Sequence, residues 1–188
     1  MYKRQTLDVA RQVRARKVDV PLVLFGYYNP IFVRGVERTC KDAVAAGIDA
    51  LLVVDLPTDE MGELAPIARA AGLGIVPLCA PTTTVARMKE MSAQDPPFVY
   101  AISMTGITGA ALTDVGEIGR RLAEVRTNVR SKVAVGFGIA SPADAVSLGQ
   151  HADAVVIGSV VLRAIEASPG READAVGELV RGFATALR

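Results

Sequence analysis

Short apolar runs alternate with amphipathic stretches along the whole chain. Six continuous apolar runs predict strands at 21–27, 50–54, 74–79, 98–102, 132–136 and 154–157. The stretches between them repeat apolar residues every three or four positions, which predicts helices at 6–17, 36–46, 60–71, 85–91, 115–129, 142–148 and 173–187, with another helix opening at 158–159. Strands that are apolar on both faces and alternate with helices are typical of parallel strands covered by helices. The pattern therefore predicts an α/β protein.

Local start and stop signals support several of these boundaries. Gly47 and Gly72 each follow a predicted helix, where glycine commonly ends one. Ser141 precedes Pro142, and this order suits an N-cap followed by the first helical residue.

Two architectures fit the alternation, a doubly wound sheet and a closed barrel. The G-x-G-x-x-G pattern of dinucleotide-binding folds follows none of the strands. Instead the last two strands run into Gly136-Phe137-Gly138 and Gly158-Ser159, as in the phosphate site formed by the last two loops of a TIM barrel. Since that barrel has eight strands, we predict an incomplete TIM (β/α)8 barrel. Residues 1–188 then form one domain with strands three to eight, the first two βα units being absent.

Composition narrows the class of protein. The chain has 188 residues, of which 51% are hydrophobic and 22% charged, and its net charge is +1. These values indicate a globular domain and give no basis for nucleic-acid binding. Cys40 and Cys79 are far apart in apolar segments, which predicts buried free thiols and fits a cytoplasmic protein. The N-terminus lacks the apolar core of a signal peptide, and no run is long enough for a membrane span.

The glycines after the last two strands predict a phosphate site. Glycine lets backbone N–H groups approach an anion, and the helix that opens after Gly158 adds unpaired donors and the positive end of its dipole. The simpler interpretation is that these glycines only form tight turns. The loop 103–113 is rich in Gly and Thr and could close over a site.

Five motifs in order resemble the α subunits of tryptophan synthase. They are 27–31 (YYNPI), 49–57 (DALLVVDLP), 98–103 with 106–109 (FVYAIS, GITG), 136–142 (GFGIASP) and 157–161 (IGSVV). The resemblance implies a cytoplasmic lyase of tryptophan biosynthesis. Its reaction is the retro-aldol cleavage of indole-3-glycerol phosphate to indole and glyceraldehyde 3-phosphate. It also implies a β subunit as partner in an α2β2 complex. Pyridoxal phosphate belongs to that partner, and the resemblance implies no cofactor and no metal for this chain.

The resemblance assigns roles to individual residues. Tyr100 would line the indole pocket near the reacting carbon, and Thr108 would order its loop and hold a catalytic aspartate. Phosphate binding would fall to Gly109, Gly138, Gly158 and Ser159. Phe137 would contact the indole, and Phe25, Leu52 and Val54 would form apolar pocket wall. Asn29, Asp55 and Pro57 match positions that face the β subunit.

The resemblance matches no residue of this chain to the family's general acid–base carboxylates. The family's glutamate ends strand two and its aspartate follows in the next loop, and no part of this chain matches them. Asp55 ends a strand, but the resemblance points to a structural or interface role. His151 is the only histidine, and Arg120, Arg121, Arg126 and Arg130 suggest a solvated helix face. We therefore expect little or no cleavage activity from the chain as written.

Two other functions fit the same residues. One is a different phosphate-binding barrel, such as a sugar-phosphate epimerase or an aldolase, although no lysine is placed at a strand end for a Schiff base. The other is a non-catalytic regulatory or binding subunit that only activates a partner.

Overall fold

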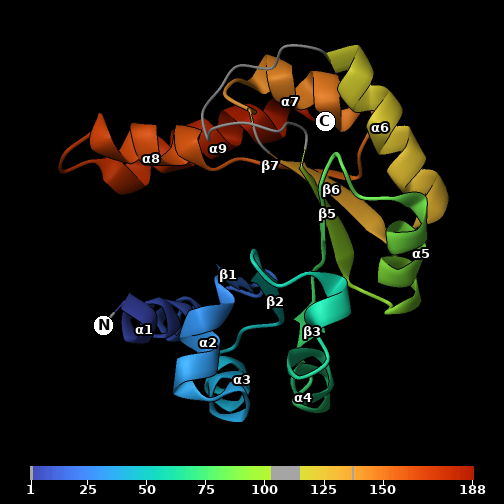
Figure 1. Ribbon diagram of the computed structural model, residues 1–188. Coiled ribbons are helices and arrows are strands. Elements are labelled where there is room, and N and C mark those ends of the chain that lie inside the picture. The colour runs from blue at the N-terminus through green and yellow to red at the C-terminus, as the bar shows by residue number, and fades with distance from the viewer. Residues whose placement is uncertain (1, 103–114, 137) are drawn as a thin grey trace. The chain divides into compact units, whose positions relative to one another are not determined.

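The computed structural model describes residues 2–102, 115–136 and 138–188, and it divides into two compact units (Figure 1). Unit 1 comprises Met1–Leu78 and Gln94–Pro97, and unit 2 comprises Cys79–Ala93 and Phe98–Arg188. In both units parallel strands alternate with helices. The parallel α/β prediction is therefore confirmed, whereas the single domain stays a prediction.

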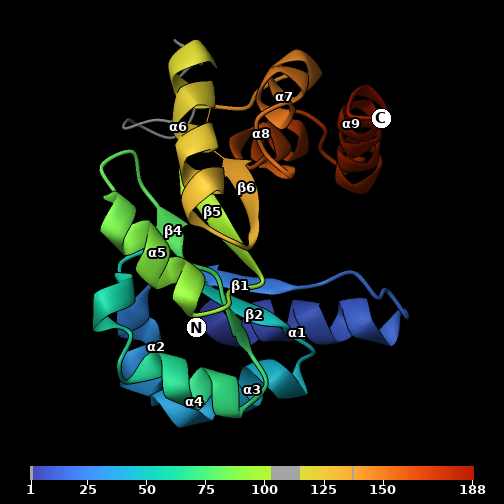
Figure 2. The ribbon, with the colours of Figure 1, turned by 90° about the vertical axis from the view of Figure 1, so that its right-hand side faces the viewer.

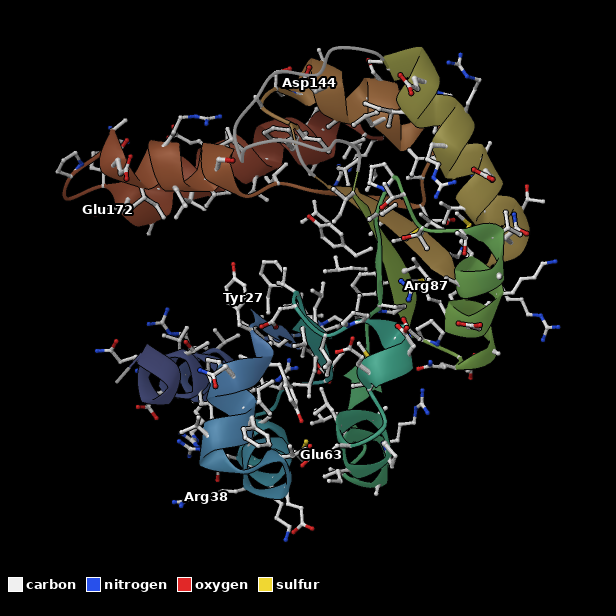
Figure 3. All side chains as sticks on the ribbon, viewed as in Figure 1. Tyr27, Arg38, Glu63, Arg87, Asp144 and Glu172 are labelled. Carbon is white, nitrogen blue, oxygen red and sulfur yellow. The ribbon has the colours of Figure 1, made fainter. Side chains whose placement is uncertain are left out.

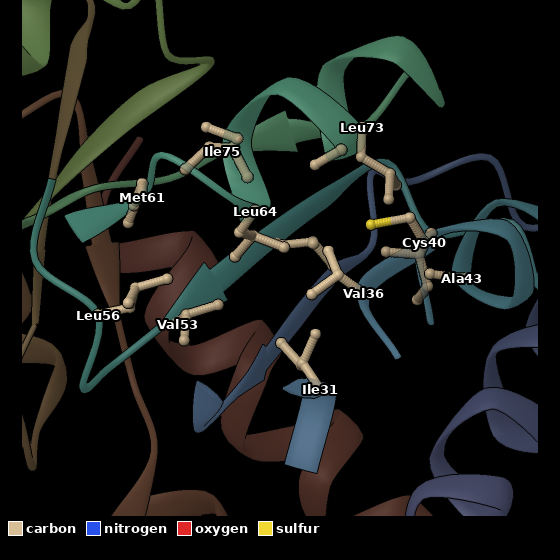
Figure 4. Packing of buried hydrophobic residues seen from close by; sticks show 14 of the residues in the cluster. Ile31, Val36, Cys40, Ala43, Val53, Leu56, Met61, Leu64, Leu73 and Ile75 are labelled. Atoms are coloured by element: carbon tan, nitrogen blue, oxygen red, sulfur yellow. The ribbon is translucent and has the colours of Figure 1, made fainter. Parts of the chain in front are cut away.

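Unit 1 is built on a three-stranded sheet of order β1-β2-β3. Its elements in chain order are α1 (Tyr2–Ala15), β1 (Val23–Gly26), α2 (Tyr28–Arg34), α3 (Val36–Ala45), β2 (Ala50–Val53), the 3-10 helix η1 (Thr58–Glu60), α4 (Leu64–Ala70) and β3 (Gly74–Ile75). Leu51 and Val53 of β2 pack into one cluster with residues of all four α-helices (Figure 4). The helices of unit 1 thus bury one face of its sheet.

The second sheet has four strands in the order β4-β5-β6-β7. Its strands and the helices that follow them are β4 (Leu78–Cys79), α5 (Val85–Ala93), β5 (Phe98–Ile102), α6 (Val115–Asn128), β6 (Lys132–Gly136), α7 (Pro142–Gly149), β7 (Ala154–Val156), α8 (Ser159–Glu166) and α9 (Glu172–Ala186). Helices α5 and α6 lie along the same face of β5 and β6 (Figure 2). Alternation along β5 sends Val99 and Ala101 into this core, so Tyr100 lies on the opposite face.

One predicted element is wrong, and one helix was not predicted. The expected strand 74–79 is two short strands, β3 and β4, which belong to different sheets. Between them lies Pro77, which has no N–H for a strand ladder. Helix α2 was not among the predicted helices, because seven residues with a proline give almost no periodic signal. Pro30 is tolerated there because it falls in the first turn, where the N–H has no partner within the helix.

Other predicted details are confirmed. Strands β5 and β6 have the expected bounds. Ser141 is the N-cap of α7 and forms a capping box with Asp144. Cys40 and Cys79 are buried free thiols, and burial raises the pKa of each. No helix among the described residues has the length and apolar character to cross a membrane.

A carboxylate joins neighbouring strands at their amino ends in both units. In unit 2, Asp153 accepts the Val133 N–H through its side chain at 2.9 Å, and its own N–H donates to the Val133 carbonyl at 2.8 Å. Lys132 Nζ lies 3.0 Å from the same carboxylate. In unit 1, Asp49 pairs in the same way with both backbone groups of Leu22 and with Arg14. Each aspartate fixes the register of two adjacent strands.

We predict that Asp153→Ala lowers the free energy of unfolding by about 1–3 kcal/mol at neutral pH, because the buried Val133 N–H loses its partner. The backbone hydrogen bond from Val133 and the cations beside it lower the pKa of Asp153. Its stabilising contribution is therefore present above the unfolded pKa of about 3.9 and is lost as pH falls toward the folded pKa. Urea denaturation from pH 7 to pH 3 measures both effects. The exposed Asp19→Ala serves as control, and an equal effect of the two substitutions would count against the joining role.

Candidate functional site

Three of the four predicted phosphate residues, Gly138, Gly158 and Ser159, follow the carboxyl ends of β6 and β7. Gly136 and Val156 are register partners in this parallel pair. Gly138 and Gly158 each follow two residues later, so they leave the same edge of the sheet at the same level. Gly138 has a φ of 77°, which favours glycine. Ser159 is the first residue of α8.

The two helices that begin beside this edge differ in their capacity to bind an anion. The N-terminus of α7 is closed by its own side chains, since Asp144 Oδ2 accepts the N–H groups of Ala140 and Ser141 at 3.0 and 2.8 Å. Helix α8 has no side-chain cap. Its N-cap, Gly158, has open space where a side chain would be. Donors at the start of α8 are therefore available to an anion.

Tyr100 lies next to this edge on the face opposite the helices. A Cβ placed on Gly136 would lie 1.9 Å from the Tyr100 hydroxyl oxygen and 2.5 Å from the ring carbon that bears it. The ring therefore covers Gly136 and requires a glycine there. Burial raises the pKa of Tyr100, so the hydroxyl is neutral at physiological pH.

The predicted apolar wall lies in unit 1. Phe25 and Leu52 are register partners in β1 and β2, one position beyond the pair Leu24 and Leu51 that packs against the helices. They therefore share the other face of that sheet. Leu52 is buried, Phe25 is 62% exposed, and Val54 follows β2 with 39% exposure. These three residues and Tyr100 belong to different units, and a common pocket stays a prediction.

The predicted interface residues surround the start of α2. Asn29 is its second residue and is exposed, and Pro57 is the exposed residue before η1. Asp55 Oδ1 accepts the Tyr28 N–H at 2.7 Å, so the carboxylate binds one of the free donors at the start of α2. This contact gives Asp55 a structural role. Sequence reasoning allowed Asp55 a structural or interface role but missed this contact, because the two residues are 27 positions apart.

Three predicted site residues, Thr108, Gly109 and Phe137, lie outside the described residues. Within residues 2–102, 115–136 and 138–188, no group of His, Cys, Asp and Glu could hold a metal ion. His151 packs against α6, where its ring atoms lie 2.9 Å from a Cβ built on Gly119. The surroundings of His151 therefore give it a packing role.

Comparisons with known proteins point to one family. A family model described as tryptophan synthase alpha chain matches residues 1–187. The tryptophan synthase alpha chain of Geotalea daltonii is 43% identical over 166 residues, which are 88% of this chain and 62% of that relative. The chain thus spans about three fifths of the length of that curated relative.

Solved structures agree with the sequence comparisons. Tryptophan synthase subunit alpha from Legionella pneumophila is similar with a TM-score of 0.88 and 27% identity, over 97% of this chain and 68% of that one. A structure of the tryptophan synthase α2β2 complex from Pyrococcus furiosus gives a TM-score of 0.88 and 34% identity, over 97% and 73%. These similarities confirm the predicted fold class, an incomplete barrel of the type found in these subunits.

The contact between Tyr100 and Gly136 makes a prediction for stability. Gly136→Ala should lower the free energy of unfolding by about 1–3 kcal/mol, because the new methyl group displaces the tyrosine ring. In a Tyr100→Ala background the same substitution should cost almost nothing. Urea denaturation of the four proteins measures the coupling. Gly26→Ala is the control, since this glycine also ends a strand but has open space around it. Equal costs in both backgrounds would contradict the contact.

Proposed function

The chain belongs to the tryptophan synthase alpha chain family, and from this premise we propose that it serves tryptophan biosynthesis by binding indole-3-glycerol phosphate for cleavage to indole and glyceraldehyde 3-phosphate. The observation that carries this proposal is the uncapped start of α8 beside Gly138, at the same sheet edge as Tyr100. This edge offers an anion site and a neutral aromatic surface within one unit.

The phosphate group binds through backbone donors. Gly158 and Ser159 supply N–H groups and the positive end of the α8 dipole, and the Ser159 hydroxyl adds a further donor. Gly138 supplies the neighbouring turn, and Gly109 would complete the site. Helix α7 is less suited to an anion, because the Asp144 carboxylate binds the N–H groups of Ala140 and Ser141 just before the helix, and Ser141 Oγ accepts the Asp144 N–H.

The indole ring requires an apolar slot with few polar groups. In unit 2 Tyr100 would contribute to this slot. The roles of Phe137 as an indole contact and of Phe25, Leu52 and Val54 as apolar wall rest on the family resemblance alone. A neutral Tyr100 suits this role because an uncharged phenol costs little to bury beside an aromatic ligand. By the family resemblance, Thr108 would order its own loop and hold a catalytic aspartate.

Cleavage also requires a proton donor at indole C3 and a base for the side-chain hydroxyl. Residues 1–188 contain no match to the glutamate and aspartate that the family resemblance assigns to these steps. We infer that the polypeptide of residues 1–188 is a lyase subunit without its acid–base pair.

A β subunit is the proposed partner, and it would supply pyridoxal phosphate while this chain needs no cofactor. The support is the exposed apolar surface of α2 in unit 1, where Phe32 and Val33 are 58% and 77% exposed beside Asn29. Exposed aromatic and aliphatic groups of this kind mark protein–protein contacts. The same surface supports the second candidate, a regulatory subunit that activates its partner without releasing indole.

We predict that Ser159→Asp weakens the binding of inorganic phosphate at least about tenfold, because a carboxylate at the start of α8 repels the anion. The substitution should leave the fold intact, since acidic residues stabilise helix N-termini. Isothermal titration calorimetry measures the affinity. Ala173→Asp is the matched control, since it adds the same charge to the first turn of α9. Unchanged phosphate affinity in Ser159→Asp would rule out this anion site.

We further predict that the polypeptide of residues 1–188 releases indole about 10²–10⁴ times more slowly than the complete Geotalea daltonii relative, which is the usual cost of losing general acid–base catalysis. Indole release from indole-3-glycerol phosphate, followed by absorbance, measures this ratio. A comparable rate would mean that carboxylates within residues 1–188 perform the proton transfers.

A further inference from the structure

Helix α2 presents the surface that we assign to the partner, and it is too short to hold its own conformation. It has seven residues, whereas isolated helices need roughly twice that length to be stable in water. Only Ile31 is buried among its residues. The direction in which Asn29, Phe32 and Val33 point therefore depends on contacts that α2 makes with the rest of unit 1.

Three polar contacts fix α2. Asp55 accepts the Tyr28 N–H at 2.7 Å, and Glu63 Oε2 accepts the Tyr28 hydroxyl at 2.8 Å. At the other end, Arg34 forms an ion pair with Asp42 of α3. Two of the three contacts converge on Tyr28, whose ring also contacts Phe32 with a centroid distance of 6.0 Å. Tyr28 thus connects a carboxylate before α4 to a residue of the exposed surface.

Glu63 is suited to hold the Tyr28 hydroxyl in one place. It is the residue before α4, a helix whose Leu64, Ala65 and Ala68 are buried in the core of unit 1. Its backbone is therefore anchored, while its side chain accepts the Tyr28 hydroxyl. Glu63 is labelled in Figure 3. Glu63 also borders a groove of about 600 Å³ between α3 and α4, beside Arg38 and Lys41.

We propose that Glu63 is a positioning residue for partner binding: it accepts the Tyr28 hydroxyl and so holds the exposed face of α2 in the orientation that the β subunit binds. This inference rests on the proposed partner. Glu63 itself would not contact the β subunit, because its whole effect on binding passes through Tyr28. Any acceptor at position 63 should serve, and removing Glu63 should have no effect once the Tyr28 hydroxyl is gone.

A double-mutant cycle tests this route. Glu63→Ala and Tyr28→Phe should each weaken binding of the Pyrococcus furiosus β subunit about fivefold, the usual value of one hydrogen bond. The double variant should also lose about fivefold, not the roughly 25-fold of two independent contacts. Glu63→Gln keeps an acceptor and should restore most of the affinity. Glu60→Ala removes a neighbouring exposed carboxylate that makes no hydrogen bond with a described residue, and it should change nothing.

Hydrogen exchange of the chain alone gives a readout that needs no partner. Amides of residues 28–34 should exchange faster in Glu63→Ala than in Glu60→Ala, whereas those of residues 36–45 should be unchanged. Additive losses in the cycle, or unchanged exchange in α2, would overturn the positioning role and leave the proposed partner standing. Failure of the unmodified chain to bind the β subunit would overturn the proposed partner and this inference together.

Discussion

The register between β6 and β7 is the constraint on which the candidate phosphate site depends. Asp153 sets it at the amino ends of the strands, where its backbone and side chain bind both polar groups of Val133. Because the two strands are parallel and paired without a bulge, that alignment carries through to Gly136 and Val156. A slip of one residue would turn every side chain of β7 to the other face. It would also separate the levels at which Gly138 and Gly158 leave the sheet.

An aspartate also sets the strand register in unit 1, and this register aligns the carboxyl ends of β1 and β2. Asp49 binds Leu22 as Asp153 binds Val133, and the residues that follow are alike, Asp-Ala-Leu-Leu-Val in one case and Asp-Ala-Val-Val-Ile in the other. The register of β1 and β2 then brings Asp55 within 2.7 Å of the Tyr28 N–H. In unit 2 the aligned edge leaves free donors for an anion. In unit 1 a carboxylate of the protein occupies the donor.

The sequence predicts the elements whose stability is local and misses those that depend on distant contacts. Strands β5 and β6 are runs of apolar residues with clear ends, and the Ser141 cap lies within three residues of its partner Asp144. Helix α2 was missed because its contacts come from Asp55 and Glu63, 27 and 35 positions from Tyr28. Arg121 was expected on a solvated face. It instead donates to the carbonyls of Ala80 and Thr83 and joins α6 to the loop before α5. Periodicity places a residue on a helix face but cannot show what packs against that face.

The two candidate surfaces depend on different kinds of atoms, and this difference decides how each tolerates substitution. The proposed anion binding at α8 would use backbone N–H groups, which most side-chain replacements leave in place. Only a change of charge, of register or of the Gly158 conformation should remove it. The surface of α2 is instead made of side chains, and three carboxylates from elsewhere in unit 1 hold the helix. Loss of a single carboxylate can therefore alter partner binding while the phosphate site in unit 2 keeps its geometry. Binding of the proposed partner should therefore be more sensitive to scattered side-chain substitutions than anion binding at α8.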